Sequence, residues 1–179
     1  MSEADFYDAI WKVIYAGRKT TKKIHWERIK NLAHVVSRYV VGSVLDLGCG
    51  FGHLSKFVAG PYLGVDLSPL AIQIARKEHP QADFMVGDIR NYHSDLIYDT
   101  VVMMQVLEHM KDRGQAIELA RTLARKRVVI SVPRGRSRCE DHVWQDIKKQ
   151  DVLDLLGPGS ACDQYRRKWI GVWKRESGV

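Results

Sequence analysis

The segment Val44-Leu-Asp-Leu-Gly-Cys-Gly-Phe-Gly-His53 decides the fold class of this chain. An apolar run that is typical of a buried strand leads directly into Gly48, Gly50 and Gly52, which let the backbone turn tightly and approach a ligand. A helix expected at residues 53–58 would begin at this turn and offer free backbone N–H groups to a bound group. A strand, a glycine turn and a helix in this order predict the first unit of an open α/β sheet with a ligand site at the turn.

The same alternation of strand-like and helix-like segments continues along the chain. Strands are expected at residues 43–47, 62–65, 84–86, 100–104 and 127–132, with helices at 53–58, 69–77, 114–124 and 145–156. Residues 161–165 and 169–173 are typical of a closing antiparallel hairpin. This order predicts a doubly wound, Rossmann-like α/β fold: a seven-stranded, mostly parallel sheet with a C-terminal antiparallel hairpin, in three α/β/α layers.

The length of 179 residues, 45% of them hydrophobic, suffices for one sizeable core. We therefore expect a single domain over residues 1–179, with its core in residues 41–179. Residues 1–40 are expected to form two helices on either side of a basic turn at residues 17–23. Their aromatic side chains suit either a lid over the ligand site or simple packing onto the core. These aromatic residues are Tyr7, Trp11, Tyr15 and Trp26.

The formal net charge of +7 favours anionic partners, nucleic acid among them. The basic residues also fall in short runs, which are typical of solvated surface. No stretch reaches the roughly 18 apolar residues needed to span a bilayer, and the first residues lack the pattern of a signal peptide. We therefore expect a cytoplasmic protein without a membrane partner and with reduced cysteines, and the oligomeric state stays open.

The spacing of the glycines argues against a dinucleotide cofactor. The dinucleotide-binding pattern G-x-G-x-x-G, counted from Gly48, would place its third glycine at the position of His53, a residue that we expect at the surface. Asp46 would also repel a pyrophosphate, whereas a cationic ligand would tolerate a carboxylate there. The motif therefore favours a ligand with a positive charge near the turn.

Two further carboxylates follow the next two expected strands. Asp66 can accept hydrogen bonds from two ribose hydroxyls, and Asp88 can accept one from an adenine amino group. The backbone N–H of Ile89 can reach a ring nitrogen. Each aspartate also has a purely local alternative, since Asp46 can brace the glycine turn and the other two can cap a helix or turn. Their order at three neighbouring strand ends favours one nucleoside site.

Together these motifs resemble those of the class I S-adenosylmethionine-dependent methyltransferases. The resembling segments are D-L-G-C-G-F-G (46–52), G-V-D-L-S (64–68), G-D-I (87–89) and Y-D-T-V-V-M-M-Q-V-L-E-H (98–109). The resemblance implies S-adenosylmethionine as the cofactor, with the glycines near its methionine part, Asp66 at its ribose, and Asp88 with Ile89 at its adenine. The residues expected to bind the cofactor are Asp46, Gly48, Cys49, Gly50, Gly52, Asp66, Leu67, Asp88, Ile89 and Gln105.

In such enzymes the methyl group is already electrophilic, so the protein aligns an acceptor atom and removes its proton where needed. These tasks fall to the carboxyl ends of the fourth and fifth strands. If the segment after the fourth strand is helical, Gln105, Glu108 and His109 share one face, and His142 approaches them from the next loop. We expect Glu108, His109 and His142 to be catalytic, with a histidine as general base. A divalent metal on the same three residues, or mere packing, are the alternatives.

The same region is similar to the small-RNA 3′-end 2′-O-methyltransferases, in which E-x-x-E-H and a later D-H-x-x-W supply a metal site. The residues that match this pattern are Glu108, His109, Asp141, His142 and Trp144. The first glutamate of the pattern is replaced by Gln105. One carboxylate fewer weakens a site for a hard cation, so we expect no metal.

The sequence thus favours a methyltransferase that modifies an oxygen or nitrogen atom of a small molecule. Arg134, Arg136 and Arg138 belong to the same edge, so that either the acceptor is anionic or this loop is simply solvated. Two alternatives stay open. One is an RNA ribose 2′-O-methyltransferase, which would bind RNA in a salt-sensitive way. The other is a non-catalytic protein that binds the cofactor or partners another methyltransferase.

Overall fold

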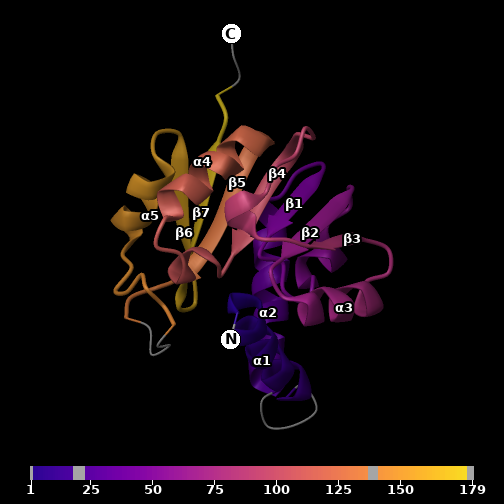
Figure 1. The fold of residues 1–179 in the computed structure, drawn as a ribbon. Coiled ribbons are helices and arrows are strands. Elements are labelled where there is room, and N and C mark those ends of the chain that lie inside the picture. Colours follow the sequence, from indigo (N-terminus) through magenta and orange to yellow (C-terminus); the bar gives the residue numbers. More distant parts are fainter. Residues whose placement is uncertain (1, 18–22, 137–140, 177–179) are drawn as a thin grey trace.

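The computed structural model describes residues 2–17, 23–136 and 141–176 (Figure 1). The helices are α1 (Glu3–Gly17), α2 (Lys23–Val36), α3 (Pro69–Glu78), α4 (Arg113–Leu123) and α5 (Lys149–Leu156). Short 3₁₀ helices are η1 (Ser37–Tyr39), η2 (His53–Phe57), η3 (Ile89–Asn91) and η4 (Leu107–His109). The strands are β1 (Val44–Leu47), β2 (Tyr62–Asp66), β3 (Asp83–Val86), β4 (Tyr98–Met104), β5 (Ala124–Pro133), β6 (Ser160–Tyr165) and β7 (Lys168–Lys174).

The seven strands form one sheet in the order β3-β2-β1-β4-β5-β7-β6. β1 to β5 pair in parallel, whereas β7 pairs antiparallel with both β5 and β6. The predicted sheet, mostly parallel with an antiparallel C-terminal hairpin, is therefore confirmed. The strand order reverses between β1 and β4, and ligands of open α/β sheets bind at the carboxyl ends of the strands beside such a reversal.

Apolar clusters fill both faces of the sheet. On one face, α4 and α5 bury residues such as Ile117 and Leu156. On the other face, α2 and α3 bury Leu32 and Ile72. Figure 1 shows helices on both sides of the sheet. Each large aliphatic side chain buried in this way contributes about 1.5–3 kcal/mol, which stabilises the predicted three layers.

Two helices differ from their predictions. The segment predicted as a helix at 53–58 forms only the 3₁₀ helix η2, which lies between the left-handed Gly52 and the extended Val58. α5 begins at residue 149 rather than 145, because Asp146 has a φ of 51° and Ile147 pairs with Gly135 in an isolated β-bridge. The extended backbone at Val58 ends the first helix early. The left-handed Asp146 and the β-bridge of Ile147 delay the start of the second.

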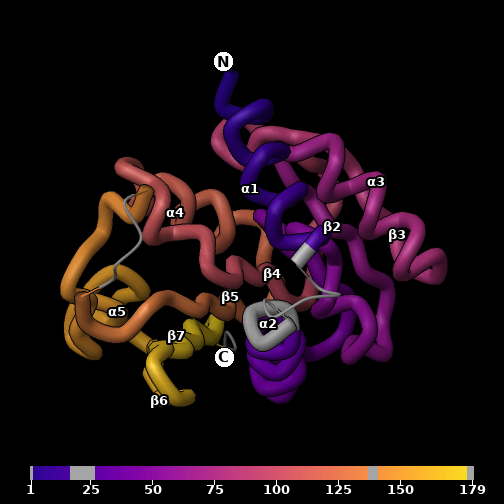
Figure 2. The backbone as a smooth tube through the Cα atoms, turned by 90° about the horizontal axis from the view of Figure 1, so that it is seen from below, coloured from indigo at the N-terminus to yellow at the C-terminus, as the bar shows by residue number. Residues whose placement is uncertain are grey.

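α1 crosses the carboxyl edge of the parallel strands and lies beside α3 (Figure 2). Its apolar and aromatic face packs on Phe51, Ala71 and Ile74 through residues that include Trp11 and Ile14. α1 therefore covers the edge of the sheet at which a ligand is expected. Within the described ranges, none of the helices is long and apolar enough to cross a membrane.

Candidate active site

The glycine turn after β1 has a backbone that favours glycine. Gly48, Gly50 and Gly52 have φ angles of 79°, 52° and 70°. A Cβ atom on Gly48 would lie 2.3 Å from Cγ2 of Val106, in the segment after β4. The N–H of Cys49 donates to a carbonyl of β2 at 3.0 Å. The turn is thus held closely between β2 and the segment that follows β4.

Asp46 places a buried carboxylate in β1, directly before this turn. The residue is 1% exposed, its Oδ2 accepts a hydrogen bond from the Tyr62 hydroxyl at 2.6 Å, and its Oδ1 has no hydrogen-bond partner. Burial raises the pKa of Asp46 to about 7, although the hydrogen bond from Tyr62 lowers it. An unpartnered buried carboxylate oxygen is costly, and a cationic ligand would offset part of that cost.

Asp66 ends β2 with both carboxylate oxygens bound to the backbone. Oδ2 accepts from the N–H of Gly50 at 2.7 Å and Oδ1 accepts from the N–H of Ser68 at 3.0 Å. Burial raises the pKa of Asp66, while these two hydrogen bonds lower it. Ser68 rather than Asp66 caps α3, because its side chain accepts from the N–H of Ala71 at 3.0 Å. Asp66 therefore links the glycine turn to the loop that contains the half-buried Leu67.

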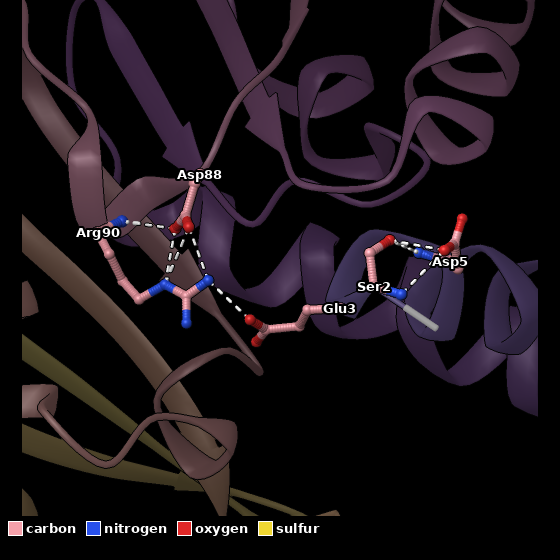
Figure 3. A network of polar contacts seen from close by, with 5 residues as sticks. All are labelled: Ser2, Glu3, Asp5, Asp88 and Arg90. Atoms are coloured by element: carbon pink, nitrogen blue, oxygen red, sulfur yellow. Dashed lines mark hydrogen bonds and ion pairs between the residues drawn. The ribbon is translucent and has the colours of Figure 1, made fainter.

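Asp88, after β3, belongs to a charge network that reaches α1 (Figure 3). Arg90 donates from Nε and Nη2 to the Asp88 carboxylate at 2.6–3.0 Å, and its Nη2 also lies 2.7 Å from Oε2 of Glu3. These hydrogen bonds lower the pKa of Asp88. Asp88 also caps η3, which begins at the half-buried Ile89, by accepting from the Arg90 backbone N–H at 2.9 Å. The carboxylate predicted to bind adenine is thus already paired with an arginine.

Other side chains of α1 reach the remaining parts of this region. Asp8 accepts hydrogen bonds from the hydroxyl of the serine that caps α3 and from the backbone at the start of α3. Trp11 lies over the glycine turn, since a Cβ atom on Gly50 would be 2.8 Å from its Cη2. Tyr7 packs edge-on against the His109 ring, with centroids 6.2 Å apart. α1 therefore contacts the segment that follows each of the strands β1, β2, β3 and β4. The sequence predicted site residues in all four of these segments.

Gln105 follows β4 with a φ of 59°, which is uncommon for a residue other than glycine. Its backbone N–H donates to Ser131 O at 2.8 Å, its side-chain amide donates to Ser131 Oγ at 3.3 Å, and its Oε1 accepts from Nζ of Lys168. The helix considered from residue 105 onward does not form, since only the short η4 follows. Gln105 therefore does not share a helical face with Glu108 and His109.

Glu108, His109 and His142 lie together, and we refer to these three residues as the Glu108 cluster. The loop after β5 returns to η4 because the N–H groups of Val143 and Trp144 donate to Glu108 O at 2.8 and 3.1 Å. The rings of His109 and His142 are 4.6 Å apart between centroids, at 89°. One ligand atom from each of the three residues lies within 4.8 Å of the others. The approach of His142 that the sequence suggested is thus present.

Burial controls the protonation of the Glu108 cluster. Glu108 is 1% exposed, its Oε2 has no hydrogen-bond partner, and burial raises its pKa to about 8. Burial lowers the pKa of both His109 and His142, so both imidazoles are neutral near pH 7. Nδ1 of His109 lies 3.0 Å from Oδ2 of Asp141, whose charge favours the imidazolium. The cluster therefore combines a protonated carboxyl group with two neutral proton acceptors.

Lys168 is a residue of this region that sequence reasoning missed. It is the first residue of β7 and pairs with Pro133, the last residue of β5, so the antiparallel register alone places it at the carboxyl edge. Burial, the larger effect, raises the pKa of Glu108 and lowers that of both histidines, and the charge of Lys168 lowers the pKa of all three residues. No local pattern in the sequence could have connected it to this edge.

The Glu108 cluster also has a donor set that suits a divalent metal, two imidazoles and one carboxylate. The positive charge of Lys168 acts on the same three groups and opposes a second positive charge among them. The donor set therefore suits either proton transfer or a metal ion, with the charge of Lys168 acting against the metal.

His53 is buried, contrary to the expectation that it lies at the surface. It is 4% exposed, and its ring lies 6.1 Å from that of His79 and 6.2 Å from that of Phe51. Burial lowers the pKa of His53 to about 3. Its position in η2, which packs under α2, makes it part of the interior rather than of the surface.

Comparison with known sequences points to one kind of protein. Residues 44–127 match the family described as "Methyltransferase domain". The probable chloroplastic tocopherol O-methyltransferase of Oryza sativa subsp. japonica is 33% identical over 135 residues, which cover 69% of this chain and 36% of that protein. The ubiquinone biosynthesis O-methyltransferase of Pseudomonas aeruginosa (strain LESB58) is 24% identical over 148 residues, which cover 76% of this chain and 63% of that protein. The chain thus spans less than two thirds of either relative.

Solved structures share the fold over nearly the whole chain. Magnesium protoporphyrin IX methyltransferase (ChlM) from Synechocystis PCC 6803 with bound SAH matches with a TM-score of 0.72 at 20% identity, over 97% of this chain and 98% of that one. The DhpI–SAH complex matches with a TM-score of 0.73 at 19% identity, over 97% and 94% of the two chains. At these identities the likeness concerns the fold.

Proposed function

We propose that this chain, which belongs to the class I S-adenosylmethionine-dependent methyltransferases, transfers a methyl group to an oxygen or nitrogen atom of a small acceptor molecule. The observation that carries the proposal is the position of the Glu108 cluster at the same edge of the sheet as the glycine turn. Val106, two residues before Glu108, already contacts Gly48 of that turn. The two O-methyltransferases that resemble the chain in sequence support this reading.

The residues of the glycine turn fit the cofactor. The cofactor supplies a methyl group on a positively charged sulfur, and the unpartnered, buried Oδ1 of Asp46 suits a positively charged ligand. We assign the methionine part of the cofactor to Asp46, Gly48, Cys49, Gly50 and Gly52, its ribose to Asp66 and Leu67, its adenine to Asp88 and Ile89, and a flanking contact to Gln105. Arg90 has to share or release the Asp88 carboxylate when adenine binds there.

The protein's own task is to hold the acceptor and to take its proton. His109 is the general base in this proposal, because the Asp141 carboxylate beside Nδ1 keeps that nitrogen protonated and leaves Nε2 to accept a proton. The same carboxylate stabilises the imidazolium that forms. Glu108, protonated near pH 7, can donate a hydrogen bond to the acceptor. His142 packs against His109 and restricts its orientation.

We further propose that residues 1–40 form a lid over the core of residues 41–179 within one domain. Glu3, Tyr7 and Trp11 follow one another at helical spacing and reach the Asp88–Arg90 pair, the Glu108 cluster and the glycine turn. A helix in contact with all three parts would exclude water from the transfer step when closed. The side chain of Trp26, also predicted for the lid, lies outside the described residues.

Calorimetric titration with S-adenosylmethionine and S-adenosylhomocysteine tests the cofactor site. The intact protein should bind both and should not bind NAD. Asp66→Ala should abolish binding, whereas the exposed Asp83→Ala should leave it unchanged. If the intact protein binds neither ligand, the proposal is wrong and a non-catalytic role becomes the better reading.

A methyl-transfer assay with radiolabelled cofactor and a panel of hydroxyl and amine acceptors tests the catalytic assignment. His109→Ala should lower kcat by about 10²–10⁴, the usual contribution of a general base. Cofactor affinity should change little. His93→Ala, at an exposed position, is the matched control. Equal turnover by His109→Ala and the intact protein would remove His109 from the mechanism.

A further inference from the structure

Five basic residues from two distant segments gather at the acceptor edge of the sheet. Arg134 and Arg136 follow β5, while Arg166, Arg167 and Lys168 form the β6–β7 turn and the start of β7. We refer to these five residues as the basic rim. In Figure 1 the β6–β7 turn lies at the lower edge of the sheet, on the same side as α1. Two runs that look like separate solvated faces in the sequence thus belong to one edge.

Specific contacts hold the two segments together. Lys168 pairs with the last residue of β5. The backbone N–H of Arg134 donates to Arg167 O at 2.9 Å, and the Arg134 guanidinium lies over the Trp169 ring, 5.4 Å from its centroid. Arg138, the third arginine that the sequence suggested here, lies outside the described residues. The rim is therefore built by strand pairing rather than by chance proximity of flexible side chains.

Nearby carboxylates offset only part of the charge of the basic rim. In the described parts of these loops and strands the carboxylates are Asp141, Asp146 and Asp163. Asp141 lies against His109, and Asp163 accepts a hydrogen bond from the Tyr39 hydroxyl at 2.8 Å. The five cations still outnumber the three carboxylates, so the described part of this edge carries a net positive charge.

Lys168 connects the basic rim to the catalytic region. It is half-buried, whereas the four arginines are exposed. Its ammonium donates to the side chain of Gln105, which Ser131 holds from β5. Its charge also acts on each member of the Glu108 cluster. A positive charge is therefore held at the side chain of Gln105, on the edge of the sheet that also carries the Glu108 cluster.

We propose that the basic rim binds an oxyanion group of the methyl acceptor, a phosphate or a carboxylate, and that Lys168 positions this group beside the Glu108 cluster. This inference rests on the proposed function and narrows its substrate class. Guanidinium groups bind two oxygens of a phosphate or carboxylate at once, and lysine adds a compact charge. The exposed arginines attract the anion from solution, and the half-buried Lys168 sets its place.

Calorimetric titration with inorganic pyrophosphate and with citrate tests the rim at low ionic strength. The intact protein should bind at least one of them. Lys168→Met and the double variant Arg134→Gln/Arg166→Gln should each weaken binding by about tenfold or more. Lys77→Met removes the same charge from the exposed side of α3 and should change binding less than about twofold. Circular dichroism checks that each variant is folded. Equal effects of Lys168→Met and Lys77→Met would overturn the inference, and so would an intact protein that binds neither these anions nor a single-stranded oligoribonucleotide.

A short single-stranded oligoribonucleotide distinguishes a small anion from the phosphates of RNA. The logarithm of its binding constant should fall linearly with the logarithm of the salt concentration, with a slope of about −0.7 for each phosphate contacted. A slope steeper than about −2 that is lost in Lys168→Met identifies RNA as the source of the oxyanion. Weak RNA binding beside tight pyrophosphate or citrate binding identifies a small acceptor. Both results support the proposed role of the basic rim. An intact protein that binds neither RNA nor the small anions refutes that role.

Cofactor titrations separate this inference from the proposed function. Binding of S-adenosylmethionine without any anion binding refutes the rim alone, whereas rim-dependent anion binding without cofactor binding refutes the proposed methyl transfer alone. Once an acceptor is known, Lys168→Met should raise KM more than it lowers kcat. Lys168→Arg should keep KM close to that of the intact protein, because arginine retains the positive charge. A merely structural role of Lys168 would not depend on that charge.

Discussion

Replacing Asp46 by asparagine should change how the stability of this protein depends on pH. Burial raises the pKa of Asp46 to about 7 in the folded chain, compared with an ordinary value of 3.8. The unfolded chain therefore releases this proton at a lower pH than the folded chain does. The stability that the protonated carboxyl contributes is fully present below pH 3.8 and is lost as the pH rises towards about 7. At 1.36 kcal/mol per pKa unit, the whole loss is about 4 kcal/mol.

Asparagine keeps an oxygen that can accept from Tyr62, but its NH₂ group takes the place of the unpartnered Oδ1 at a cost of about 1–3 kcal/mol at every pH. The difference in unfolding free energy between Asp46→Asn and the parent should thus move in favour of the variant by about 3 kcal/mol between about pH 5 and about pH 8. Urea unfolding followed by circular dichroism measures this difference, with the exposed Asp83→Asn as control.

The same variant should bind S-adenosylmethionine about tenfold more weakly or worse, because it lacks the negative charge that faces a cationic ligand. The buried carboxylate of Asp46 thus links a cost in stability to cofactor binding. A stability difference that stays constant with pH, or unchanged cofactor affinity, would refute this link.

Three further predictions concern the turn, the interior and the Glu108 cluster. Gly48→Ala should destabilise the fold by about 1–3 kcal/mol, visible as a lower Tm in calorimetry, because its Cβ would lie 2.3 Å from Val106 at a φ of 79°. His53→Phe should reduce the loss of stability on acidification: the pKa of His53 is about 3, so the unfolded chain takes up the proton first as the pH falls below 6.5. Between about pH 7 and pH 5 this amounts to about 2 kcal/mol, and an unchanged pH dependence in urea unfolding would contradict it. Methyl transfer should survive EDTA, because the charge of Lys168 opposes a metal at the Glu108 cluster; a loss of rate that Zn²⁺ restores would show the opposite.

The sheet, the glycine turn and the carboxylates at the strand ends are predictable because each depends on a few neighbouring residues. The apolar run before Gly48 predicts a buried strand, and the closely spaced glycines predict a turn with left-handed backbone. Parallel strands bring their carboxyl ends to one edge, so Asp66, Asp88 and Glu108 could be assigned to one region without coordinates.

The sequence by itself determined the order of the strands and helices, the turn and the residue types available at the edge of the sheet, because short-range sterics and burial patterns set them. Tertiary structure alone decided that His53 is buried, that Ile147 joins a β-bridge instead of α5, and that Lys168 stands beside Gln105. Each of these depends on the register and packing of segments far apart in the chain. A local sequence pattern does not specify which distant segment will pair with it.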